Sequence, residues 1–210
     1  MNDESPPAEA RIRILREAER LFADQGYDGT SVQQVAEAAG VRRPTLIYHF
    51  GSKDQLRLEV LEGVLSRWKE ELPRILLASQ SGPDRFRSIL ETAFAFFYER
   101  PDRARLLTRE MLDRPAEMTS LFAEHLKPYM KLVTDRIRDG QREGHTRRDV
   151  DPEAYVVHLM HAAVSMAAMG HATKHVLDDP PSAERLQAEL IRLGKAALFL
   201  DRPNLGDRDG

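Results

Sequence analysis

The sequence predicts an all-α protein, with a three-helix helix-turn-helix domain at the N-terminus and a larger helical bundle after it. Three observations support this fold class. Ala, Leu, Arg and Glu are abundant, and no run of β-branched residues alternates with period two, as a half-buried strand would. Apolar residues recur at helical spacing. Gly and Pro divide the 210 residues into segments of helical length.

Glycines and capping motifs predict three helices in the first quarter of the chain. Gly26 supplies the left-handed residue that ends many helices, and Gly40 and Gly51 break the next two. Ser31 and Gln34 have the S-x-x-Q spacing of a capping box, which satisfies backbone donors where a helix begins. The predicted helices are Ala8–Gln25, a short helix that ends at Gly40, and about Arg43–Phe50.

The remainder of the chain is also predicted to be helical. Ser52 and Gln55 form a second capping-box pair, which opens a long helix to about Leu72, where Pro73 limits or kinks it. The later helices are Arg85–Glu99, Arg103–Asp113, Pro115–Glu143 with a division near Pro128, Glu153–Leu177 and Ala183–Leu200. We therefore expect a helix-turn-helix domain over 1–55 with 1–7 disordered, a regulatory and dimerisation domain over 56–202, and a frayed tail over 203–210.

Composition narrows the possible functions. Without cysteine the chain has no disulfide, thiolate metal site or cysteine nucleophile. The N-terminus lacks a secretory signal, and no stretch approaches the ~20 apolar residues of a membrane helix, so we expect a cytoplasmic protein with no membrane partner. The net charge of −3 argues against a broad nucleic-acid coat protein. Locally, Arg42, Arg43, Lys53 and Arg57 outnumber Asp54, which suits either focused docking on DNA or an ordinary solvated helix.

Two short helices joined by Ala39-Gly40-Val41 have the dimensions of a helix-turn-helix. Short helical hairpins are also common in ordinary helical cores, so this spacing alone does not distinguish the two. With Leu46 and Phe50 facing the core, the third helix presents a set that is unusual on a surface without a partner. The exposed set is Arg42, Arg43, Pro44, Thr45, Ile47, Tyr48 and His49.

These residue types suit double-stranded DNA. Arg addresses the O6 and N7 acceptors of guanine, and Thr or Ile contacts the methyl group of thymine. Tyr, His and Thr donate hydrogen bonds to phosphate oxygens. Lys53 lies in the first turn of the next helix, where backbone N–H groups also favour an anion. We interpret the third helix as a recognition helix for the major groove.

A dense set of residues in the first quarter also matches a known family. The set is Leu21-Phe22, Gly26-Tyr27, Thr30-Ser31-Val32, Val35-Ala36, Ala39-Gly40-Val41, Thr45-Leu46, Tyr48-His49-Phe50, Ser52-Lys53-Asp54 and Leu56. In these residues the chain resembles the TetR family of bacterial transcription regulators; the rest matches only in layout. The resemblance implies a homodimeric repressor that binds a palindromic operator, and a larger domain in which a small-molecule effector separates the two recognition helices.

The resemblance also implies roles for single residues. It places Arg42, Arg43, Pro44, Thr45 and Ile47 toward the major groove, and Thr30, Ser31, Tyr48, His49 and Lys53 on phosphates. Two positions depart from the family pattern. Pro44 stands where glycine is common; proline is tolerated in a first turn but disfavours helical angles at Arg43, so recognition begins later or Arg43 is re-aimed. Ile47 stands where an aromatic residue is common, which indicates contact with a thymine methyl group.

The last two helices are predicted, mainly by this resemblance, to form the dimer interface. The alternative is that their apolar stripes pack only within their own chain. Small residues on the first helix allow close approach, and the stripe on the second is close to heptad spacing. The predicted dimer residues are Met160, Ala163, Val164, Ala167, Leu186, Leu190, Leu193 and Ala197.

A mostly apolar effector pocket with a few polar anchors is predicted between the middle helices. Each candidate residue is equally consistent with plain core packing. The candidates are Trp68, Phe94, Phe97, Tyr98, Leu107, Met111, Phe122, His125, Tyr129, Met130, His161 and Met166. Arg105 and Arg109 share a helical face and suit an anionic ligand or simple surface charge.

We predict no metal and no cofactor. His171 and His175 have a spacing able to share a metal, but the dimer seam or a helix end is the simpler explanation. A helical-bundle enzyme and a protein-binding adaptor without specific DNA binding remain as alternatives. No Gly-rich phosphate loop and no G-x-S-x-G motif supports the enzyme.

Overall fold

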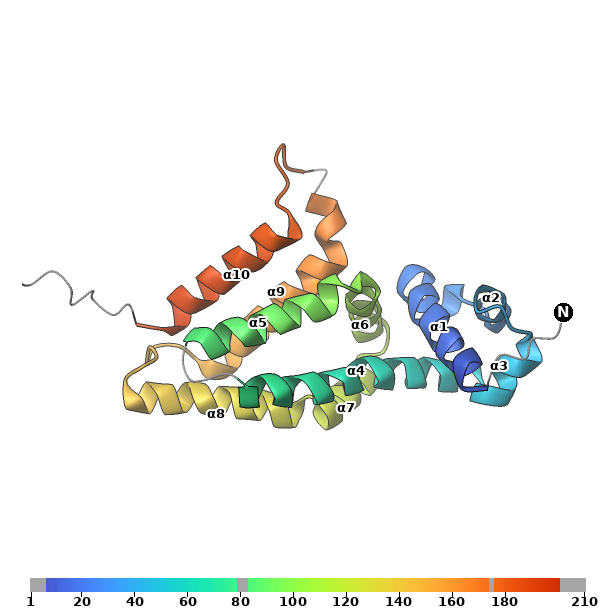
Figure 1. Ribbon diagram of the computed structural model, residues 1–210, viewed down its shortest axis with the longest axis horizontal. Helices are drawn as coiled ribbons and strands as arrows, with labels where there is room; N and C mark the ends of the chain where they lie inside the picture. Colours follow the sequence, from blue (N-terminus) through green and yellow to red (C-terminus); the bar gives the residue numbers. More distant parts are fainter. Residues whose placement is uncertain (1–6, 79–82, 174–175, 201–210) are drawn as a thin grey trace, which may run out of the picture.

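The computed structural model describes residues 7–78, 83–173 and 176–200, and in these ranges it contains ten helices (Figure 1). The description covers their side chains except those of residues 7, 68, 69, 71–78, 83–85, 171 and 173. The only strand-like pairing in these ranges is an isolated bridge between Thr146 and Phe199. In the same ranges no helix has the length and hydropathy needed to cross a bilayer. The predicted all-helical fold is confirmed.

Three helices gather at one end of the molecule and form what we call the DNA-binding unit (Figure 1). They are α1 (Pro7–Gly29), α2 (Val32–Ala38) and α3 (Arg43–Phe50). Within α1 the backbone leaves helical geometry at Gly26, whose φ is 74°, so the main run of α1 ends where the sequence predicts. Pro7 is already helical, whereas the sequence predicted disorder through residue 7; the predictions for residues 1–6 and 203–210 lie outside the described residues.

Helix α4 (Lys53–Ala78) leaves the DNA-binding unit and runs along the length of the larger domain, which we define as α4 to α10 (Figure 1). The predicted end at Leu72 is wrong, because the helix continues through Pro73. A proline inside a helix removes one backbone donor and can kink the helix without ending it. One continuous helix therefore connects the three N-terminal helices to the larger domain.

The remaining helices lie around this long helix. They are α5 (Pro83–Tyr98), α6 (Pro101–Asp113), α7 (Pro115–His125), α8 (Lys127–Glu143), α9 (Pro152–Thr173) and α10 (Ala183–Leu198). Most begin with a proline, whose missing N–H is not needed in a first turn. The division predicted near Pro128 falls at Leu126, between α7 and α8. Leu177, the predicted end of the ninth helix, is not helical.

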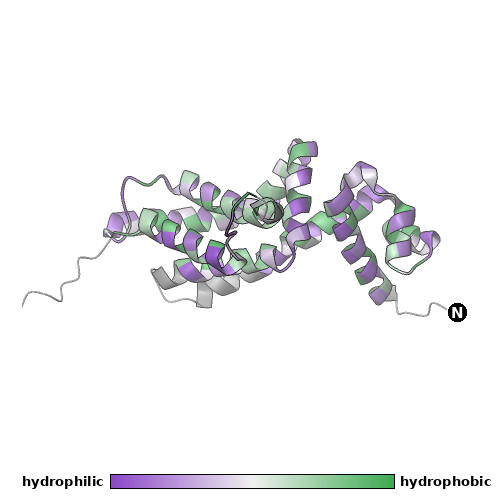
Figure 2. Ribbon diagram, turned by 90° about the horizontal axis from the view of Figure 1, so that it is seen from above, coloured by the Kyte–Doolittle hydropathy of each residue, from purple (hydrophilic) through white to green (hydrophobic). Residues whose placement is uncertain are grey.

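One apolar core runs from the DNA-binding unit into the larger domain. Phe22 of α1, Leu46 of α3, Leu61 of α4 and Leu106 of α6 are all buried in it. Figure 2 shows the corresponding pattern, with hydrophobic and hydrophilic residues alternating along each helix. A second cluster joins α5, α9 and α10 through Phe94, Ala163 and Leu190. The two parts of the chain therefore share packed apolar surface and are not separated by a flexible linker.

A buried ion pair adds a polar connection inside the larger domain. Arg57 of α4 is only 3% exposed, and its Nη1 donates to Oε2 of Glu110 on α6 at 2.7 Å. Its Nη2 donates to Glu117 of α7 at 2.5 Å. Since α4 begins at the DNA-binding unit, this pair fixes the first turns of α4 against α6 and α7.

Arg105 and Arg109 of α6 reach across to α1. The Nε of Arg109 donates to the backbone oxygen of Ala23 at 2.9 Å, and its Nη2 donates to that of Asp24 at 3.1 Å. Arg105 lies 3.5 Å from the carboxylate of Asp24. These exposed or partly exposed residues fit the predicted alternative of surface charge, and both join α6 to the end of the main run of α1, where the partial negative charge of a helix favours cations.

Removing one member of the buried pair should destabilise the protein more than removing both. We expect Arg57→Met to lower the free energy of unfolding by about 3 kcal/mol, because the buried carboxylate of Glu110 loses its 2.7 Å hydrogen bond and keeps only the 3.8 Å contact with Arg114. The double variant Arg57→Met, Glu110→Leu should regain most of that loss. Urea denaturation measures both variants. A double variant no more stable than the single one would show that the stranded charge is not the cause.

Candidate nucleic-acid interface

The predicted capping box at the start of α2 is confirmed. The hydroxyl oxygen of Ser31 accepts from the N–H of Gln34 at 3.1 Å, and the N–H of Ser31 donates to the side-chain oxygen of Gln34 at 2.7 Å. Both bonds satisfy donors that a helix start leaves open. They fix the direction in which α2 leaves α1.

A sharp turn joins α2 to α3, as the sequence predicts. Gly40 has a φ of 67°, a left-handed conformation that favours glycine. The N–H of Val41 donates to the backbone oxygen of Ala36 at 2.9 Å, and the Val41 side chain is buried. The Nε of Arg13 in α1 donates to the backbone oxygen of Ala39 at 3.1 Å. The bond within the turn and the bond from α1 together hold the angle between α2 and α3.

Helix α3 begins at Arg43 despite the proline that follows. Arg42 is the extended residue before the helix, and its backbone oxygen accepts from the N–H of Thr45 at 2.9 Å. Pro44 lies in the first turn, where no intrahelical N–H is required. The helix therefore begins at Arg43, where the sequence predicts it.

Two residues anchor α3, and the others form its outer face. Leu46 and Phe50 are buried, as predicted. Arg42, Arg43 and Pro44 are exposed, Tyr48 is 84% exposed, and Thr45 and His49 are partly exposed. Ile47 departs from the expected exposed set because it is only partly exposed and packs against the core.

The two arginines at the start of α3 differ from most others in the protein. Arg11, Arg57 and Arg100 each pair with a glutamate. Neither Arg42 nor Arg43 has a carboxylate partner within 4 Å among the described residues. Two unneutralised guanidinium groups at the start of an exposed helix are suited to bind phosphate or guanine.

Thr30 does not fit its predicted role. Only 1% of it is exposed, and its hydroxyl donates to the backbone oxygens of Gly26 at 2.8 Å and Leu21 at 3.2 Å. The hydroxyl is therefore occupied in closing the turn between α1 and α2. Ser31, the other residue predicted there, is exposed.

Lys53 is held by a residue to which the sequence analysis gave no role. Its Nζ lies 3.9 Å from the ring centroid of Tyr27, a cation–π contact. The Tyr27 hydroxyl donates to Oδ1 of Asp54 at 2.7 Å. The pKa of Tyr27 is raised, mainly because the side chain is partly buried and secondly because of this hydrogen bond. The only signal in the sequence was the Gly26-Tyr27 pair of the family motif.

The structure does not bring all the predicted effector residues together in one place. Phe94, Tyr98 and Met166 come together in the second apolar cluster, while Phe97, Leu107 and Phe122 belong to the main core. Met111 and His161 are exposed, so neither lines a buried pocket; helical periodicity turns them outward. Tyr129 and Met130 are partly exposed. The Trp68 side chain lies outside the described residues.

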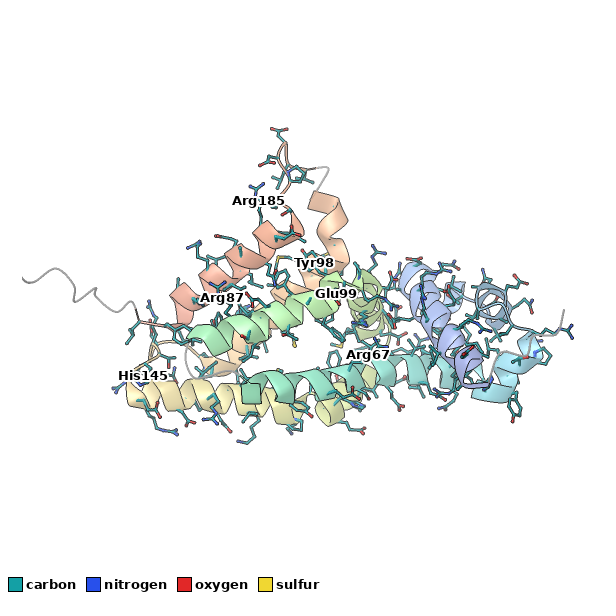
Figure 3. All side chains as sticks on the ribbon, viewed as in Figure 1. Arg67, Arg87, Tyr98, Glu99, His145 and Arg185 are labelled. Carbon is teal, nitrogen blue, oxygen red and sulfur yellow. The ribbon has the colours of Figure 1, made fainter. Side chains whose placement is uncertain are left out.

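Two predicted anchors have buried polar atoms without a hydrogen-bond partner. Among the described residues, nothing satisfies the Tyr98 hydroxyl or Nδ1 of His125. Tyr98 lies at the end of α5, near α9, and stacks on Phe94 with ring centroids 5.1 Å apart (Figure 3). Burial raises the pKa of Tyr98. A separate open cleft of about 490 Å³ lies between α4 and α7, and none of the predicted pocket residues lines it.

The predicted dimer residues also divide. Ala163, Ala167 and Leu190 are buried within the chain, and Val164 packs against its core, so these four face inward. Met160 and Leu186 are partly exposed, whereas Leu193 and Ala197 are exposed. The alternative of packing within the chain therefore holds for half of the set.

The outward stripe of α9 consists of other residues. It includes Val157, His158, His161 and Met169, all exposed. From residue 154 to 173 the sequence contains no Asp, Glu, Lys or Arg. In the described part of the chain no three potential metal ligands gather. His175 and the His171 side chain lie outside the described residues.

The match with known protein families covers both parts of the chain. Residues 14–60 match the model of bacterial regulatory proteins of the tetR family. Residues 83–193, which are more than half of the chain, match the model of a tetracyclin repressor-like C-terminal domain.

Individual relatives agree with this match. The HTH-type transcriptional repressor AcnR of Corynebacterium efficiens is 29% identical over 176 residues, which are 80% of this chain and 87% of AcnR. The ketosteroid transcriptional regulator KstR2 of Mycobacterium tuberculosis superposes with a TM-score of 0.72 at 18% identity, over 95% of this chain and 98% of that chain. AibR, solved with isovaleryl coenzyme A and operator DNA, superposes with a TM-score of 0.68 at 19% identity. The match covers 88% of this chain and 97% of the AibR chain.

Thr30→Val should separate stability from DNA contact. We expect the variant to lose about 1–3 kcal/mol of unfolding free energy, because two backbone oxygens lose a buried donor. The salt dependence of DNA binding should not change. Ser52→Ala, which removes the cap bond from the N–H of Gln55, is the matched control for a loss of stability, worth about 1 kcal/mol. A smaller salt slope for Thr30→Val would instead indicate that the hydroxyl contacts phosphate.

Proposed function

The chain belongs to the TetR family of bacterial regulatory proteins, and we propose that it is a sequence-specific DNA-binding repressor. The observation that supports this most directly is the exposed start of α3, where Arg42 and Arg43 have no carboxylate partner within the described part of the chain. We assign these arginines to base edges and Ser31, Tyr48, His49 and Lys53 to phosphates. The repressor function is supported by the name of AcnR.

We propose that the protein acts as a homodimer through α9 and α10. An exposed helix face with no charged side chain is unusual on a soluble protein, because charged residues normally cover such surfaces. The face of α9 carrying Val157 and Met169 meets this description, and Leu193 of α10 adds to it. A two-fold dimer would place two copies of α3 on half-sites of a palindromic operator, about 34–36 Å apart or a multiple of that.

We further propose that a small, largely apolar effector releases the protein from its operator. The support is Tyr98, whose buried hydroxyl has no partner among the described residues and lies next to the apolar cluster of Phe94, Ala163 and Leu190. An unsatisfied buried hydroxyl is destabilising, and a ligand with one hydrogen-bonding group would satisfy it. AibR shows that this fold accommodates both an effector and operator DNA in one protein.

Selection of genomic DNA fragments by the purified protein, followed by footprinting, tests the DNA-binding function. A single palindromic site bound at about 10⁻⁸ M or tighter would establish a specific regulator. Arg43→Ala should weaken operator binding by about 1–3 kcal/mol and relax the base preference at one position. Lys53→Ala should weaken binding to operator and random DNA alike, with a salt slope smaller by about one.

Two results would contradict this assignment. Equal losses on operator and random DNA for both variants would remove the distinction between base and phosphate contacts. A protein-binding adaptor predicts no salt-dependent affinity for DNA at all. Turnover of a substrate by the purified protein would instead favour the helical-bundle enzyme.

The dimer assignment predicts a contrast between two similarly exposed apolar residues. Val157 of α9 is 43% exposed and Leu132 of α8 is 41% exposed. Val157→Arg should raise the dimer dissociation constant by at least about 100-fold, because two unpaired charges would be buried at the interface. Leu132→Arg should leave dimerisation unchanged. Sedimentation velocity measures both, and equal effects would place the interface elsewhere.

A further inference from the structure

The junction between the DNA-binding unit and the larger domain is centred on the ring of Tyr27. Three cations approach it: Nζ of Lys53 at 3.9 Å, Cζ of Arg114 at 4.4 Å and Cζ of Arg57 at 5.7 Å from the ring centroid. The hydroxyl donates to Asp54 at 2.7 Å. These residues come from α4 and from the turn between α6 and α7, so one side chain of α1 contacts two segments of the larger domain.

Two of these cations belong to the ion-pair network of the larger domain. Arg57 donates to one oxygen of the Glu110 carboxylate at 2.7 Å. Nη1 of Arg114 lies 3.8 Å from the other oxygen of that carboxylate. Glu110 is buried, so its carboxylate holds both guanidinium groups in place. A shift of α6 against α4 would therefore move cations that rest on Tyr27.

The third cation lies next to the end of α3, which the proposed function places on DNA. Lys53 is the first residue of α4 and follows the end of α3 at Phe50 by three positions. Its ammonium has no carboxylate within 4 Å among the described residues, and it makes a cation–π contact with the Tyr27 ring. A lysine stem is flexible, and without such a contact its ammonium would occupy many positions. The ring therefore restricts where Lys53 presents its charge.

We propose that Tyr27 is a positioning residue for the phosphate contact of Lys53, and that it links this contact to the ion-pair network of Arg57, Arg114 and Glu110. The inference rests on the proposed function, because it takes Lys53 as a phosphate contact. Cation–π attraction is additive with phosphate binding, since the ring faces one side of the ammonium and leaves the other side to an anion. A change at the α6–α7 turn would thus alter phosphate binding through one aromatic ring.

A double-mutant cycle tests this proposal without knowledge of the operator. The probe is a short random-sequence DNA duplex, because phosphate contacts do not depend on sequence. In the wild type, Lys53→Ala should lower the salt slope by about one. Tyr27→Leu should weaken binding by about 2- to 5-fold. In the Tyr27→Leu background, Lys53→Ala should then have an effect smaller by the same factor.

Two further substitutions at position 27 separate the ring from the rest of the side chain. Tyr27→Phe removes the bond to Asp54 but keeps the ring, so Lys53→Ala should retain its full effect. If Tyr27→Leu does not fold, pentafluorophenylalanine at position 27 preserves the volume and reverses the charge distribution of the ring. This variant should reduce the Lys53 effect as Tyr27→Leu does. Thermal unfolding of each variant confirms that the fold is intact.

The outcomes of this experiment are distinct. An equal Lys53→Ala loss in the wild type, Tyr27→Leu and pentafluorophenylalanine backgrounds overturns the positioning role and leaves the proposed function intact. Arg114→Met should also reduce the Lys53 effect, because the guanidinium that lies 4.4 Å from the ring centroid, held by Glu110, no longer fixes the ring against which Lys53 rests; no reduction overturns the link to the network. If the wild type shows no salt-dependent affinity for the duplex, the proposed function fails first, and the inference fails with it.

Discussion

The position of α4, the helix that leaves the DNA-binding unit, depends on the buried contact of Arg57 with Glu110 of α6. A charged pair taken out of water is stable only when both members are held and hydrogen-bonded, so it tolerates one arrangement of α4 and α6 far better than any other. Apolar packing between helices is less selective, since it tolerates small slides. The shared core therefore supplies the attraction between the DNA-binding unit and the larger domain, and the ion pair specifies how α4, which begins at that unit, lies against α6.

The larger domain combines a packed interior with two features that a self-contained bundle would not need. One is the uncharged outward stripe of α9, and the other is the unsatisfied hydroxyl of Tyr98. Both reduce the stability of an isolated chain, the first by exposing apolar surface and the second by leaving a buried donor open. The proposed function assigns a second molecule to each, a partner copy to the stripe and an effector to the hydroxyl.

Local signals in the sequence were sufficient for the helices and for much of the recognition surface. The Ser31 capping box, the left-handed Gly40 and the inward pair Leu46 and Phe50 all follow from short-range chemistry, and the structure has them as predicted. The tertiary contacts could not be predicted from these local signals. Neither the partner of Arg57, 53 residues away, nor the burial of Thr30 follows from spacing along the chain. The inward turn of Ala163 was missed because α9 is apolar on every face, so periodicity could not identify which face packs.

Few contacts attach helix α3 to the rest of the protein. Two buried side chains, Leu46 and Phe50, and the bonds of one turn hold its eight residues, and most of its remaining positions face outward. Substitutions at those outward positions remove few internal contacts, so they barely affect folding. Operator preference can therefore diverge between descendants of this protein while the scaffold is inherited unchanged, and the same separation makes α3 a natural site for grafting a new DNA specificity.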